Sequence, residues 1–198
     1  MTFSDLSVII RNSFTAPDLA MRQLIALDLP LSARWMALGL AIAASTVISM
    51  LTVAMYPVAA PPVMMLFSPF SFAAIQLTLT ATGAVLLSSL GRIFGGRGNF
   101  ADSLLLVAWI ELLLLGAQLV QVLLLIVPMI SGLFGLAAVI ALTWVMVRMI
   151  QALHKFSNVF LVFLGLIFGT IMTLLIAVSI ASALGLMSEI TPEMLNEL

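Results

Sequence analysis

The chain has 198 residues, of which 64% are hydrophobic and only 8% are charged. A soluble domain has about a quarter of its residues charged, and a disordered chain is poor in apolar residues, so this composition excludes both classes. The net charge of −1 offers no polybasic surface for nucleic acid, and the absence of cysteine excludes disulfides, thiolate metal sites and thiol catalysis.

Residues 1–34 form the only sizeable polar segment, and we predict two short amphipathic helices in it. Phe3, Leu6, Ile10 and Phe14 repeat at helical spacing, and a second helix should begin near residue 17 and end before residue 30. Charged residues interrupt the apolar runs, which is unlike a signal peptide. Such helices typically lie at a membrane surface. Anchoring is the favoured role, and binding of a partner is the alternative.

Beyond residue 34 the chain consists mostly of five apolar stretches. Crossing the ~30 Å hydrocarbon core takes about 20 helical residues, so we predict an all-α membrane protein, a five-transmembrane-helix bundle over residues 35–187. The tail at 188–198 contains three glutamates and no cation, and we expect it on the outer side. The predicted spans are 35–56, 70–90, 103–127, 129–150 and 159–187.

The positions of the cations predict the orientation. All seven lie before the first span, between the second and third spans, or at the end of the fourth span and just after it, which places them on one side of the membrane. Basic residues favour the cytoplasmic side. The N-terminus should therefore be cytoplasmic and the C-terminus outside. These cations are Arg11, Arg22, Arg34, Arg92, Arg97, Arg148 and Lys155.

Polar side chains inside the spans are candidate functional groups, because hydrocarbon penalises charge. Glu111, Gln118 and Gln121 form a polar stripe on the third span. Arg148 lies at a comparable depth to Glu111 and could pair with it, and Gln76 could meet Gln121. In the favoured interpretation these groups hold the bundle together, each contact contributing about 0.6–2 kcal/mol. The alternative is a proton or substrate site.

The glycine-rich connection at 91–102 resembles a phosphate-binding loop only superficially. It lacks the Lys-Ser/Thr ending and the preceding strand of a P-loop. We predict a flexible turn in which Asn99 or Asp102 caps the third span, with a lipid headgroup on its arginines as the alternative. His154 is the only histidine, which is too few ligands for a metal site. The expected cytoplasmic interaction residues are Arg92, Gly95, Gly96, Arg97, Asp102, His154 and Lys155.

Two segments resemble the Yip1 family: 91–102 (GRIFGGRGNFAD), and 142–144 (LTW) followed by 153–157 (LHKFS). With the five spans, the resemblance covers about residues 15–187 and implies a membrane-embedded bundle that works through partners. Eukaryotic relatives act in vesicle traffic around the Golgi and endoplasmic reticulum and bind Rab-type small GTPases. This chain lacks their long cytoplasmic N-terminal region and looks like a bacterial inner-membrane member, for which we assume no Rab partner.

The sequence therefore predicts a non-enzymatic scaffold or adaptor without cofactor or metal, in a bacterial inner membrane. Its expected partners are the lipid bilayer and proteins, and homo-oligomers are possible. No nucleic-acid partner is expected. The alternative is a small oligomeric transporter or channel that uses the polar stripe around Glu111.

Overall fold

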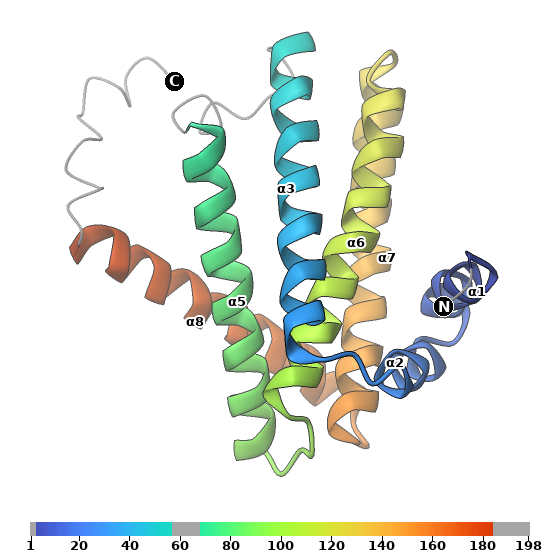
Figure 1. Ribbon diagram of the computed structural model, residues 1–198, viewed down its shortest axis with the longest axis vertical. Coiled ribbons are helices and arrows are strands. Elements are labelled where there is room, and N and C mark those ends of the chain that lie inside the picture. Colours follow the sequence, from blue (N-terminus) through green and yellow to red (C-terminus); the bar gives the residue numbers. More distant parts are fainter. Residues whose placement is uncertain (1–2, 57–67, 184–198) are drawn as a thin grey trace.

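A computed structural model of the chain describes residues 3–56 and 68–183, and over these ranges it contains seven helices and no strand. Four of the long helices stand side by side, the last long helix runs obliquely away from them, and two short helices lie at one side (Figure 1). The predicted all-α class is therefore confirmed. The helices are α1 (Phe3–Thr15), α2 (Pro17–Ala26), α3 (Leu31–Met55), α5 (Pro69–Ile93), α6 (Phe100–Leu124), α7 (Pro128–His154) and α8 (Val159–Ala183).

The five long helices have the length and composition of membrane spans. Each has 25 to 27 residues, which at 1.5 Å per residue gives about 38 to 41 Å of helix and exceeds the ~30 Å hydrocarbon core. All five contain a stretch apolar enough to cross a membrane. Within the described residues the five-span prediction is confirmed. The predicted outer tail at 188–198 lies outside those residues.

Local chemistry explains where the helices begin and end. The Asn99 side chain accepts the Asp102 backbone N–H at 2.8 Å, which starts α6 at Phe100 and confirms one of the two predicted caps. Lys155 ends α7 in a left-handed conformation, with its N–H bonded to the Gln151 carbonyl. Asn158 then caps α8 by accepting the N–H of Phe160 at 2.9 Å. These caps move α6 three residues earlier than predicted and extend α7 to His154.

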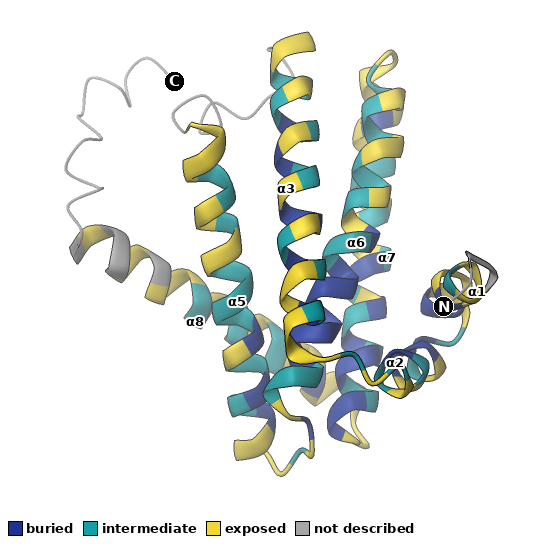
Figure 2. Ribbon diagram, viewed as in Figure 1, coloured by how far each residue is buried: buried dark blue, intermediate teal, exposed yellow. Residues whose placement is uncertain are grey.

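The core is centred on α6, which packs against α3, α5 and α7. Its residues from Ser103 to Ile110 are all buried. Buried residues concentrate in the lower half of the bundle, near the α5–α6 and α7–α8 connections (Figure 2). The upper halves of the spans expose mainly apolar side chains. Such an exposed apolar surface suits lipid rather than water.

The two N-terminal helices are docked on the bundle. α2 packs against α7, and α1 packs against α2. The buried side chains of α1 include Ile9, Asn12 and Ser13, whereas the predicted apolar positions Ile10 and Phe14 are 41% and 49% exposed. The face of α1 that touches the protein is thus mixed, with Leu6 and Ile9 packed on the core beside the buried polar Asn12 and Ser13. Its apolar face is left for the membrane surface, as expected of an interfacial helix.

α8 departs from the other spans. It leans away from the bundle, so that its C-terminal end lies far from α5 (Figure 1). Near its start it packs against α5 and α7. This lean opens the space described below.

Candidate functional site

An ion pair joins the beginnings of α3 and α6. Arg34 Nη1 lies 2.7 Å from Asp102 Oδ1, and the two side chains are only 7% and 16% exposed. Arg34 Nε also donates to the Leu29 carbonyl at 2.8 Å, and Asn99 Nδ2 donates to Asp102 Oδ2 at 2.8 Å. Sequence analysis assigned Asp102 to partner binding. The structure shows instead that its carboxylate is occupied within the bundle.

His154 joins the α5–α6 and α7–α8 turns. Its ring is buried, with 1% of the residue exposed, and Nδ1 accepts the Gly98 N–H at 3.2 Å. The His154 carbonyl accepts the Arg97 N–H at 3.3 Å. The ring also stacks on Phe156, with 5.3 Å between the centroids. The segments 91–102 and 153–157, which carried the family resemblance, are therefore parts of one structure.

The glycines of this turn are explained by the imidazole. A Cβ on Gly91 would overlap the His154 ring, and a Cβ on Gly96 or Gly98 would lie 2.5 or 2.6 Å from its nearest ring atom. Gly95 has a φ of +82°, a backbone conformation that residues with a Cβ rarely adopt, so glycine is favoured there without any contact to the ring. The glycine-rich pattern thus lets a histidine from another helix enter the turn. Nothing about it requires a phosphate.

Three of the predicted interaction residues remain exposed cations. Arg92, Arg97 and Lys155 are all on the surface next to the His154 contact. None of them forms an ion pair with any carboxylate in residues 3–56 and 68–183. Gly95 is also exposed, whereas Gly96 is partly buried. The accessible part of this turn is therefore basic and lacks a partner for its charge.

The expected ion pair between Glu111 and Arg148 is not formed. Glu111 faces α5, where its carboxylate accepts hydrogen bonds from Thr80 Oγ1 at 3.3 Å and Gln76 Nε2 at 3.5 Å. Arg148 instead donates to Gln151 Oε1 at 2.8 Å on its own helix.

Arg148 also lies over the Trp144 ring, with Cζ 5.7 Å from the centroid. Trp144, Arg148 and Gln151 share one face of α7 because they are spaced by three and four residues. The long arginine side chain follows that face instead of entering the bundle.

The polar stripe on α6 contacts three different helices, α3, α5 and α7. Glu111 bonds to α5, and Gln118 Nε2 donates to Ser49 Oγ on α3 at 2.8 Å. Gln121 lies against Gly135 of α7, so the expected contact between Gln121 and Gln76 is absent. The stripe thus divides among neighbours and does not line one common path. These contacts agree with the favoured interpretation of helix-to-helix bonding.

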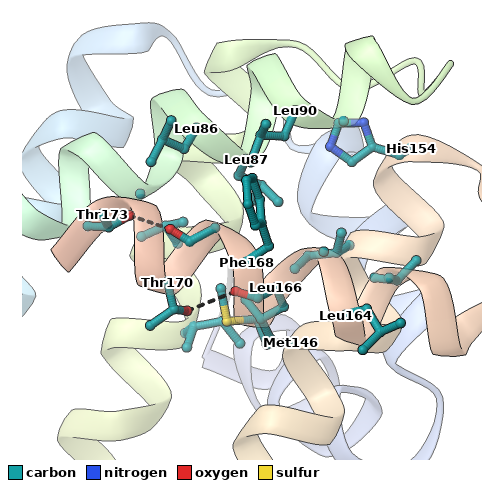
Figure 3. A pocket seen from close by; sticks show the side chains of 18 of the residues that line it. Leu86, Leu87, Leu90, Met146, His154, Leu164, Leu166, Phe168, Thr170 and Thr173 are labelled. Carbon is teal, nitrogen blue, oxygen red and sulfur yellow. Dashed lines mark hydrogen bonds between the residues drawn. The ribbon is translucent and has the colours of Figure 1, made fainter. Parts of the chain in front are cut away.

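A cavity of about 1000 Å³ lies between α5, α6, α7 and α8. Leucine and phenylalanine side chains dominate its wall, with Leu86, Leu87 and Leu90 facing Phe168 (Figure 3). Thr170 and Thr173 also line it, but their hydroxyls donate to carbonyls of their own helix at 2.9 Å. The wall is therefore apolar except for Thr80 and Glu111 on one side and the polar residues at the end near the α7–α8 turn.

The sequence does not reveal this cavity, because the lean of α8 creates it and no local pattern encodes that lean. One signal was available in Gly83 and Gly165. Both line the cavity, and a Cβ on either would meet no atom within 4 Å. Within the described residues no group of three or more His, Asp or Glu lies close enough to hold a metal ion.

Comparison with known proteins gives one match. The family model described as the Yip1 domain matches residues 11–186. No curated protein sequence and no solved structure matches the chain.

Proposed function

The chain belongs to the Yip1 domain family, and from that membership we propose that it is a non-enzymatic membrane scaffold or adaptor. Its partners would be proteins or lipids that bind at the cytoplasmic turns. The observation that carries this proposal is the basic surface of Arg92, Arg97 and Lys155. A buried histidine holds that surface in place, and its charges are unpaired. Preorganised exposed charge favours recognition, because little side-chain and loop ordering remains to be done on binding.

We place the protein in a bacterial inner membrane, with the N-terminus in the cytoplasm and the C-terminus in the periplasm. The support is the one-sided distribution of cations. The contacts of Arg34 with Asp102 and of Arg97 with His154 agree with it, since both join segments assigned to the same side.

The test uses the full chain in its native membrane. A photoreactive amino acid replaces Arg97 in one variant and Leu123 in a matched control. Leu123 is 73% exposed and lies at the opposite end of α6. We expect discrete protein adducts from position 97 that weaken when Arg92 is changed to glutamate. The same adduct pattern from both positions would argue against a cytoplasmic binding surface.

One observation favours a second candidate, a small transporter or channel. Glu111 and Thr80 lie on the wall of the large cavity, and an ionisable residue in a span is a functional candidate by default. Purified protein in liposomes should show no ion or proton flux if it is a scaffold. Flux that is lost in Glu111→Gln would replace our proposal with this one.

A further inference from the structure

The cavity between α5 and α8 has the dimensions of a lipid site. The α5 residues that line it run from Leu79 to Gly91, which is about 18 Å of helix. One leaflet of the hydrocarbon core is about 15 Å deep. An acyl chain that lies along the cavity therefore crosses its whole leaflet. The cavity volume of about 1000 Å³ is large enough for such a ligand.

The cavity also opens laterally, toward the surrounding lipid. Several lining residues are exposed on the outside of the bundle, including Leu161 at 63%, Leu164 at 45% and Phe168 at 49%. An apolar groove open to the membrane is in direct contact with lipid tails. The threonine hydroxyls on its wall are already bonded to their own helix, so an acyl chain leaves no donor of theirs unsatisfied.

The cytoplasmic end of the groove is basic. His154 lines this end, and the exposed cations Arg92, Arg97 and Lys155 lie beside it without lining the groove themselves. Arg92 follows Gly91, whose backbone lies against the imidazole, Arg97 bonds to the His154 carbonyl, and Lys155 is the next residue. The nearby carboxylate of Asp102 is neutralised by Arg34. Positive charge thus gathers where a tail in the groove would place its headgroup.

His154 itself has one hydrogen-bonding atom unused. Nδ1 accepts from Gly98, so a neutral ring carries its proton on Nε2. Within the described residues Nε2 is buried and makes no hydrogen bond of good geometry, although the Leu87 backbone lies close enough to act on the ring as an acceptor. A buried donor without a well-placed acceptor is unfavourable, so the protein alone does not fully satisfy the polar groups at this end of the groove.

We propose that the groove between α5 and α8 holds an acyl chain of one anionic phospholipid, whose headgroup is bound by Arg92, Arg97 and Lys155. Three observations support this assignment. The groove is long enough for an acyl chain, it opens to the bilayer, and cations without a counter-charge among the described residues lie at one end. It deepens the lipid part of the proposed function, on which it rests for naming the cytoplasmic leaflet.

The test uses full-length protein that is purified, delipidated and reconstituted. Vesicles of phosphatidylcholine contain a small fraction of either phosphatidylglycerol or phosphatidylcholine with a photoreactive acyl chain. We expect the phosphatidylglycerol probe to label α5 and α8 peptides of the groove more strongly. In Arg92→Gln/Lys155→Gln this preference should fall about 30-fold, which corresponds to about 1 kcal/mol for each cation near an anionic lipid.

Two sets of controls match these variants. Arg11→Gln/Arg22→Gln removes the same charge from α1 and α2 and should keep the preference. Gly165→Leu fills the groove and should abolish groove labelling. Gly132→Leu, at an exposed glycine of α7 with open space around it, should not. If Gly165→Leu does not fold, Gly83→Leu fills the same groove from α5.

Equal labelling by the two probes, or equal loss in the matched controls, would overturn this inference. The outcome is separable from that of the proposed function. Absent lipid labelling with protein adducts retained at position 97 removes the lipid site alone. Lipid labelling without those adducts removes the protein-binding role alone.

Discussion

Replacing Asp102 with asparagine should destabilise the protein strongly. The substitution keeps the size of the side chain but leaves Arg34, whose side chain is 7% exposed, without a counter-charge. Breaking a buried pair by removing one partner costs about 3–5 kcal/mol. Because the Asp102 side chain is 16% exposed, we expect a value at the lower end, about 3 kcal/mol. The assay is equilibrium unfolding of the full chain in mixed detergent with increasing dodecyl sulfate.

The other ion pair of the described residues provides the control. Arg22 and Asp18 lie 3.8 Å apart on the surface of α2, with side chains 74% and 46% exposed. Such exposed pairs contribute about 0–1 kcal/mol, so Asp18→Asn should change the unfolding free energy by no more than that. Equal effects of the two substitutions would refute the reasoning, because the short, buried pair should contribute more than the long, exposed one.

A double substitution sharpens the test. Arg34→Met removes the charge that Asp102→Asn leaves unpaired, so the double variant should recover part of the lost stability. The coupling free energy between the two positions then measures the ion pair itself. Additive losses would show that each residue acts through other contacts.

Three further predictions use simple variants. Gly91→Ala should cost about 1–3 kcal/mol, because its methyl group would overlap the buried His154 ring; the same unfolding titration checks it, with Gly116→Ala, which has open space around it, as the harmless control. Trp109→Phe removes the indole N–H that donates to α1 at 2.9 Å, a loss of about 1 kcal/mol. It should also make residues 3–15 more sensitive to protease while the spans stay protected. A reporter fused after Leu198 should be active only in the form that requires export. A signal from the cytosolic reporter would contradict the predicted orientation.

The sequence carried enough information for the fold but not for the pairing of polar groups. Five apolar stretches and one-sided cations require only composition and periodicity, which are local. The cap at Asn99 was also predictable, because it acts within one turn. Arg34 and Asp102 lie 68 residues apart, and their meeting depends on how α3 packs beside α6. The partners of Glu111 depend likewise on helix rotation, which decides between α5 and α7.

The docking of the N-terminal helices has a consequence for how the protein is assembled. Ser13 accepts a hydrogen bond from Trp109, which is synthesised 96 residues later. α7, against which α2 packs, is synthesised later still. During synthesis α1 and α2 must therefore remain near the membrane until the helices on which they dock have been made. The exposed apolar side chains of Ile10 and Phe14 can bind α1 to the bilayer surface during this time. These two helices are thus synthesised before the helices on which they finally dock.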